Sequence, residues 1–121
     1  MFPDADLIAF TTYPALVFQS PAEIPDDYYT EAAERAGKPV AFTEIGWHAA
    51  QLGAPGWDSD EEEQAEFIRT YLRLTEDVEP VLSIWAFLYV LPGQPIIFET
   101  MTLVRPDGSF PPAWDAWNQG E

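Results

Sequence analysis

Apolar positions along the chain follow two patterns, short continuous runs and longer stretches with helical spacing. The continuous runs are "DLIAFTTY" (Asp6 to Tyr13), "VAFTE" (Val40 to Glu44) and "VLSIWAFLYV" (Val81 to Val90). Each run is rich in strand-forming residues and adjoins a proline, so each predicts a buried strand. Strands that are apolar on both faces are typical of a parallel sheet covered on both sides.

Two segments between these runs predict helices. In "DDYYTEAAERAG", residues 26–37, the alanines form one apolar face, and Gly37 is placed to end the helix in a left-handed conformation. In "DEEEQAEFIRTYLRLTE", residues 60–76, apolar residues return every three or four positions. Ser59 and Glu62 match the capping-box pattern that starts a helix.

The order of these elements predicts an α/β fold. A third, short helix is expected in "PPAWDAWNQ", after a loop at residues 91–110. Strands that alternate with helices at this spacing favour a parallel sheet built from right-handed βαβ units. Three helices cover only one face of a three-stranded sheet. We therefore predict that residues 1–121 form a single incomplete domain, whose sheet continues into strands outside this chain.

Composition and charge narrow the classes of function. Hydrophobic residues make up 47% of the chain and aromatic residues 15%, which excludes a disordered tail. The formal charge of −16 would repel a nucleic-acid backbone and an anionic membrane surface. No run reaches the roughly 18 apolar residues of a membrane helix, and the first residues lack a signal-peptide pattern. With no cysteine and one histidine, the chain predicts no metal and no cofactor.

Glu44 is the first candidate for chemistry, because it ends an apolar strand. A carboxylate left in apolar surroundings costs several kcal/mol unless it is solvated, paired or neutralised. Ligands of α/β proteins bind at the carboxyl ends of parallel strands, where such a side chain faces a cleft. The alternative, a solvated glutamate or one that caps a helix, stays equally open at this point.

Several aromatic side chains are candidates for the same rim. Tyr13 ends the first predicted strand and Trp85 lies in the third, where a phenol can orient a carboxylate and an indole can cover a sugar ring. Both residues also fit a role in the core. In the long loop that follows Glu44, Trp47 either lines the site or anchors the loop, and His48 either contacts substrate or faces solvent.

Four segments carry a resemblance to a known family. "TEIGW" after "KPVAF" resembles the seventh-strand motif of clan A glycoside hydrolases, which are (β/α)8 barrels, and the endo-galactanase-like group in particular. "DLIAFTTYP" resembles the sixth strand, "VLSIWAFLYV" the eighth, and "GSFPPAWDAW" the closing segment of these proteins. The resemblance implies the C-terminal part of a TIM barrel, with about three βα units and parallel strands.

The resemblance also implies roles for individual residues. Glu44 matches the catalytic nucleophile, Tyr13 the tyrosine that orients it, and Trp85 the tryptophan beneath the reacting sugar, while Trp47 and His48 become substrate contacts. The family's acid/base glutamate follows an asparagine on the fourth strand, and this chain has no Asn-Glu pair. The resemblance therefore implies part of a retaining enzyme that cleaves β-linked polysaccharide or oligosaccharide, and inactivity of the chain in isolation.

Partners and location follow from the same resemblance. The expected partners are a carbohydrate substrate and either the missing N-terminal half of the barrel or another copy of the chain. Family members favour an extracellular or periplasmic location. A non-catalytic alternative remains, in which a half-barrel binds carbohydrate on Trp47 and Trp85 or only self-associates.

Overall fold

The alternation of strands and helices predicted from the sequence is present in the structure. The computed structural model describes residues 4–53 and 56–119. In chain order its elements are β1 (Ile8–Thr12), the 3-10 helices η1 (Pro14–Leu16) and η2 (Pro21–Glu23), α1 (Tyr28–Ala36), β2 (Val40–Ile45), α2 (Glu61–Leu74), β3 (Leu82–Trp85), α3 (Ile96–Glu99) and α4 (Pro112–Gln119).

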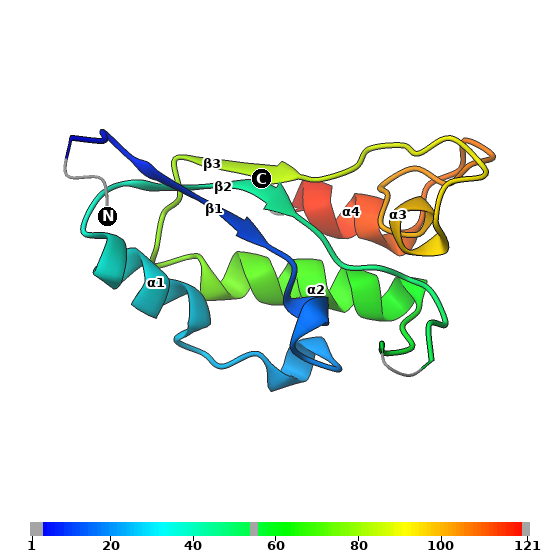
Figure 1. Cartoon of the computed structure of the whole chain (residues 1–121), viewed down its shortest axis with the longest axis horizontal. Coiled ribbons are helices and arrows are strands. Elements are labelled where there is room, and N and C mark those ends of the chain that lie inside the picture. Colours follow the sequence, from blue (N-terminus) through cyan, green and yellow to red (C-terminus); the bar gives the residue numbers. More distant parts are fainter. Residues whose placement is uncertain (1–3, 54–55, 120–121) are drawn as a thin grey trace.

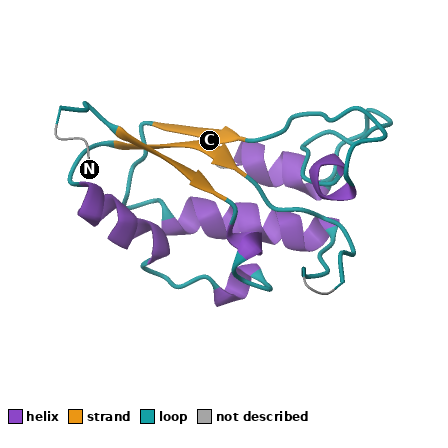
Figure 2. Cartoon of the chain, in the orientation of Figure 1, coloured by secondary structure: helices purple, strands orange, loops and turns teal. Residues whose placement is uncertain are grey.

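The three strands form one parallel sheet in the order β1-β2-β3 (Figures 1 and 2). The central strand is β2, whose register shifts where Phe42 pairs with Phe10 but Glu44 pairs with Thr11. Thr43 is thus one extra residue in the strand. Such a bulge bends a strand and re-aims its side chains, and here both Thr43 and Glu44 are exposed.

Helices cover only one face of this sheet (Figure 1). On that face, Val40, Phe42 and Ile45 of β2 are buried, and Tyr29 and Tyr71 pack edge-on against Phe42 at 5.4 and 5.6 Å between ring centroids. Perpendicular ring pairs at this distance are favourable beyond their buried area. The core therefore lies between the sheet and helices α1, α2 and α4.

The opposite face of the sheet is bare in the part of the chain that the structure describes. Leu82 and Ile84 of β3 are 48% and 44% exposed there, although the strand pattern predicted burial on both sides. Sheets of parallel strands are normally covered on both faces. The exposed apolar side chains agree with the expectation that further structure completes this sheet.

Three local predictions need correction. β3 ends at Trp85 rather than Val90, because the chain turns away and makes only an isolated bridge from Phe87 to Thr102. The predicted loop 91–110 contains the short helix α3. The cap of α2 is Asp60 rather than Ser59, since its carboxylate accepts the amide of Glu63 at 2.8 Å.

Gly37 adopts the left-handed conformation predicted for it, with φ of 63°, and ends α1. None of the helices within the described residues combines the length and apolarity needed to cross a membrane.

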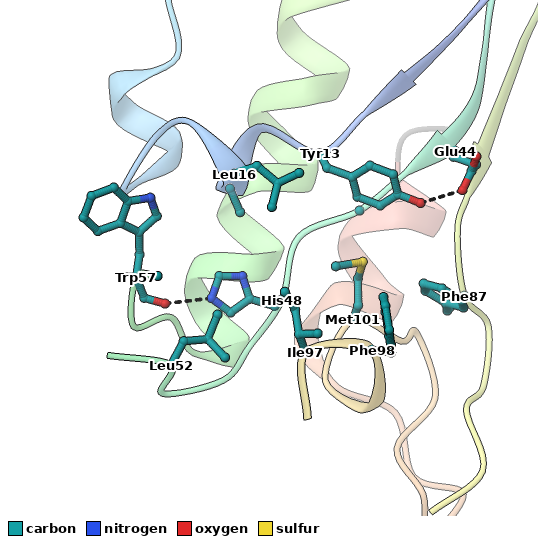
Figure 3. A pocket seen from close by; sticks show the side chains of 13 residues that line it. Tyr13, Leu16, Glu44, His48, Leu52, Trp57, Phe87, Ile97, Phe98 and Met101 are labelled. Carbon is teal, nitrogen blue, oxygen red and sulfur yellow. Dashed lines mark hydrogen bonds between the residues drawn. The ribbon is translucent and has the colours of Figure 1, made fainter. Parts of the chain in front are cut away.

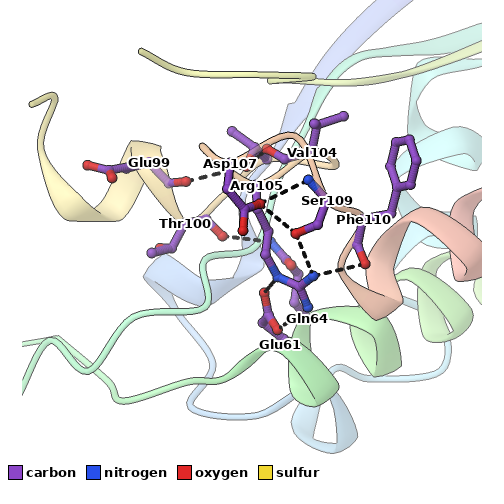
Figure 4. A network of polar contacts seen from close by, with 10 residues as sticks. Glu61, Gln64, Glu99, Thr100, Val104, Arg105, Asp107, Ser109 and Phe110 are labelled. Carbon is purple, nitrogen blue, oxygen red and sulfur yellow. Dashed lines mark hydrogen bonds and ion pairs between the residues drawn. The ribbon is translucent and has the colours of Figure 1, made fainter. Parts of the chain in front are cut away.

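A polar network attaches the segment after β3 to the start of α2 (Figure 4). Arg105 donates two hydrogen bonds to the carboxylate of Glu61, at 2.7 and 2.8 Å, and one to the carbonyl of Phe110. The buried amide of Gln64 donates to the carbonyls of Trp47 and Thr100, at 2.7 and 2.9 Å. The loops that follow β2 and β3 are thus held together on one end of α2.

Candidate active site at the carboxyl ends of the strands

A pocket of about 530 Å³ lies at the carboxyl ends of the strands (Figure 3). Its wall comes from the segments that follow each strand: Tyr13, Ala15 and Leu16 after β1; Glu44, Gly46, His48, Leu52, Gly56 and Trp57 from β2 and its loop; Phe87, Ile97, Phe98 and Met101 after β3. This edge of a parallel sheet is where α/β proteins place their ligands. The volume is within the range of small-molecule sites.

Glu44 and Tyr13 meet at one side of the pocket. The Tyr13 hydroxyl donates a hydrogen bond of 2.8 Å to Oε1 of Glu44. Burial raises the pKa of Tyr13 to about 12, helped by that hydrogen bond and by the negative charge of Glu44. The hydroxyl therefore stays protonated below about pH 12, and it can hold the carboxylate in one orientation throughout the neutral range.

Gly46 allows Tyr13 to reach this position. A Cβ atom at residue 46 would lie 2.6 Å from Cε1 of Tyr13 and 2.5 Å from Sδ of Met101. Contacts this short are repulsive, so a side chain would displace the tyrosine ring or the methionine. Packing thus requires a glycine at this position of "TEIGW", because Gly46 leaves space for the Tyr13 ring, which orients Glu44.

We expect Gly46→Ala to destabilise the chain by about 1–3 kcal/mol, the usual cost of overpacking. Chemical denaturation of the variant measures this loss. In the double variant Gly46→Ala/Tyr13→Ala the clash with the ring is gone. Its loss of stability should therefore be smaller than the sum of the losses measured for the two single variants. A Gly46→Ala variant as stable as the parent would show that the close approach of Tyr13 is incorrect.

His48 lines the pocket but does not face solvent. Its side chain is only 2% exposed, and Nε2 donates to the carbonyl of Trp57 at 2.9 Å. This bond holds the two ends of the loop after β2 together. The structure therefore gives His48 a place in the pocket wall and corrects the solvent-facing alternative.

Trp47 and Trp85 do not reach the pocket. Trp47 is fully buried, stacks on Phe67 at 5.1 Å between centroids and donates to Ser59 at 3.0 Å. Trp85 is 6% exposed, donates to the Met101 carbonyl at 2.7 Å and lies on the helical side of the sheet. Both indoles lie in the core, Trp85 at the end of β3 and Trp47 in the loop after β2, so the described residues do not show the substrate contact expected of either.

The aromatic and apolar wall that the structure does show was not predicted. Phe87 occupies the place at the end of β3 that was expected for Trp85, and Ile97, Phe98 and Met101 come from a predicted loop. One signal was available in "QPIIFETM", because several large apolar residues in a row are unusual for a solvated loop. No such signal is present in the sequence for Phe87, because the direction of its side chain depends on where β3 ends.

Chemically, the pocket offers one carboxylate, one phenol and one imidazole in an otherwise apolar wall. Within residues 4–53 and 56–119, no three acidic or histidine side chains come together as ligands for a metal ion. A carboxylate that is exposed, oriented by a phenol and placed at a strand end suits attack on an electrophilic carbon.

Comparison with known proteins supports this placement at the level of the fold. No protein-family model matches the sequence, and no curated protein sequence matches it significantly. Solved structures do match. The β-D-glucuronidase of Dictyoglomus thermophilum has a TM-score of 0.70 at 17% identity, over 97% of this chain and 22% of its own.

Two further structures match over a larger share of their own length. The GH53 catalytic domain of Ignisphaera aggregans has a TM-score of 0.64 at 17% identity, over 95% of this chain and 39% of that one. The glycoside hydrolase family 17 β-1,3-glucanosyltransferase of Rhizomucor miehei has a TM-score of 0.66 at 16% identity, over 89% and 42%.

The chain therefore spans well under half of each of these structures, in agreement with its uncovered sheet face. Its fold is that of part of a (β/α)8 barrel, with three parallel strands and their helices, as in these three structures.

Proposed function

We propose that this chain is the C-terminal part of a retaining glycoside hydrolase and supplies its catalytic nucleophile, Glu44. The observation that carries the proposal is the 2.8 Å hydrogen bond from Tyr13 to Glu44 at the mouth of the pocket. It places an oriented, exposed carboxylate at the carboxyl end of the central strand of the sheet. Catalytic residues of barrel enzymes occupy this position.

In the proposed reaction, Tyr13 engages Oε1 of Glu44, so Oε2 is the oxygen that attacks the anomeric carbon. The bond from that carbon to the leaving oxygen breaks as the ester to Glu44 forms. A second carboxylic acid protonates the leaving oxygen and then deprotonates the water that hydrolyses the ester, which frees Glu44.

The second carboxyl group comes, in this proposal, from barrel units outside the chain. Retaining enzymes hold their two carboxyl groups about 5–5.5 Å apart. Glu44 is the one carboxylate among the described residues that line the pocket. The open sheet face beside it leaves room for the rest of the barrel and its acid/base residue.

The proposed substrate class is a β-linked oligosaccharide or polysaccharide. Support comes from the similar structures, whose names describe a β-glucuronidase, a GH53 catalytic domain and a β-1,3-glucanosyltransferase. Two of these names specify a β-linked sugar, a β-glucuronide and a β-1,3-glucan, and the third gives only the family of a catalytic domain. The proposal therefore extends to a β-linked sugar and names no particular one.

Reconstitution tests the proposed function. The chain is assayed on β-galactan, β-mannan and β-glucan, alone and joined to the barrel units that the upstream coding sequence specifies. We expect hydrolysis only by the joined protein. Equal hydrolysis by the isolated chain, or none by a correctly folded joined protein on any β-linked substrate, would contradict the proposal.

A second candidate function, self-association, is favoured by the apolar residues on the bare sheet face. Leu82 and Ile84 are 48% and 44% exposed there. Contiguous exposed apolar side chains mark a contact surface. By contrast, the burial of Trp47 and Trp85 removes the aromatic platform on which a non-catalytic sugar-binding module was expected to rest.

We expect the isolated chain to elute from a sizing column as a dimer or larger, because burial of this face removes apolar surface from water. Ile84→Glu should shift it toward the monomer. The control Leu91→Glu changes a residue that is 68% exposed and lies outside the sheet, so it should have no effect. A monomeric parent chain, or equal behaviour of the two variants, speaks against association through the sheet.

A further inference from the structure

The pocket beside Glu44 is far more apolar than a site that holds a second sugar requires. Its side away from Glu44 is lined by Leu16, Leu52 and Ile97, with Met101 and Phe98 beneath Tyr13 (Figure 3). A sugar ring presents several hydroxyl groups. Each hydroxyl that is buried without a partner costs roughly 1–3 kcal/mol, so this wall discriminates against a sugar.

Polar side-chain atoms are few in this wall. The Tyr13 hydroxyl donates to Glu44, and Nε2 of His48 donates to the carbonyl of Trp57. Nδ1 of His48 is buried and has no hydrogen-bond partner among the described residues. These groups lie toward the two ends of the pocket (Figure 3), so most of the wall between Glu44 and His48 offers a ligand apolar contact.

Two of the apolar residues are also unusually exposed. Leu16 is 74% exposed and Phe98 is 43% exposed, and they come from opposite walls, after β1 and after β3. Large apolar side chains that gather around a concave site indicate an apolar ligand. The single negative charge at the site, on Glu44, and the net charge of −16 disfavour an anionic one.

We propose that this pocket binds a neutral aromatic or aliphatic group attached to the sugar, so that the glycoside cleaved at Glu44 carries an apolar aglycone. The inference rests on the proposed function and narrows its substrate class. The sugar lies over Glu44 at the carboxyl ends of the strands, while the aglycone extends between Leu16 and Phe98 toward Trp57. The apolar wall then stabilises the leaving group through burial rather than hydrogen bonds.

Binding of a free probe tests this inference without catalysis. The 121-residue chain is titrated with 2-naphthol and, separately, with methyl β-glucoside, by calorimetry. We expect 2-naphthol to bind and the glucoside to bind at least about tenfold more weakly, because only the first matches the wall. Tighter binding of methyl β-glucoside than of 2-naphthol would overturn the inference.

Variants locate the bound probe. Leu16→Asn should weaken 2-naphthol binding about fivefold or more, since it replaces an apolar wall residue whose exposure makes it tolerant of change. Leu82→Asn is the matched control on the bare sheet face and should leave binding unchanged. If Leu82→Asn weakens binding and Leu16→Asn does not, the probe sits on the sheet and the inference fails.

The test also separates this inference from the proposed function. Glu44→Gln should retain 2-naphthol binding, because the apolar wall is intact, whatever its effect on hydrolysis. Loss of hydrolysis with retained binding supports both proposals. Retained hydrolysis by Glu44→Gln would contradict only the nucleophile, whereas absence of 2-naphthol binding by the folded chain would contradict only the aglycone pocket.

Discussion

Replacing Glu44 by Gln in the joined barrel is expected to lower kcat by roughly a thousandfold or more. An amide has the size of the carboxylate but cannot form the covalent ester with the anomeric carbon, so the first step of the retaining reaction is lost. The loss is measured as steady-state hydrolysis of a β-linked substrate. KM should change far less, because Glu44 acts mainly in the transition state.

The control for this experiment is Glu34→Gln, which makes the same change at an exposed position on α1. It should leave kcat within about twofold, as surface substitutions usually do. Tyr13→Phe should give an intermediate loss, because it removes the hydrogen bond to Oε1 and leaves the nucleophile in place. Full turnover by a folded Glu44→Gln protein would exclude the nucleophile role.

The second large effect is expected on stability, from Trp47→Ala. Trp47 has no exposed surface, stacks on Phe67 and donates to Ser59, so its removal leaves a cavity and takes a hydrogen-bond donor from the Ser59 hydroxyl. Truncations of this kind cost about 3–5 kcal/mol, which is a large share of the stability of a small domain. Urea denaturation followed by circular dichroism measures the difference.

Trp57→Ala is the matched control, because Trp57 is only partly buried and lines the pocket. Trp57→Ala should lower the free energy of unfolding by less than about half of the amount lost in Trp47→Ala. Should Trp47→Ala prevent folding altogether, Trp47→Phe keeps most of the packing and should cost about 1–2 kcal/mol. A Trp47→Ala chain as stable as the parent would place Trp47 outside the core and restore it as a sugar contact.

Much of the fold was predictable, because its signals are local. The parallel strands, the two long helices and the stop at Gly37 follow from apolar spacing and from one residue that tolerates a positive φ. The end of β3 could not be predicted from such local signals. Residues 86 to 90 are as apolar as the strand, and only tertiary contacts, such as the bridge from Phe87 to Thr102, show that the chain has left the sheet.

The candidate site was predictable for Glu44 and Tyr13, since both stand at strand ends that parallel pairing brings to one edge. The directions of the Trp47 and Trp85 side chains were not predictable. The local sequence gives the type of a side chain, whereas bulges and the path of a loop decide where it points. One extra residue in β2, Thr43, decides which side chains near Glu44 face the pocket. The similar structures establish the fold, and the role of Glu44 stays a prediction.

We propose that Glu44 forms the covalent bond to the sugar, and this bond can be detected. The most direct measurement is mass spectrometry of the joined protein after reaction with a 2-deoxy-2-fluoro β-glycoside, which slows hydrolysis of the ester and lets it accumulate. We expect one added glycosyl group on the peptide that contains Glu44, and none in the Glu44→Gln variant. A label on another carboxylate, or turnover of the normal substrate with inversion at the anomeric carbon, would contradict it.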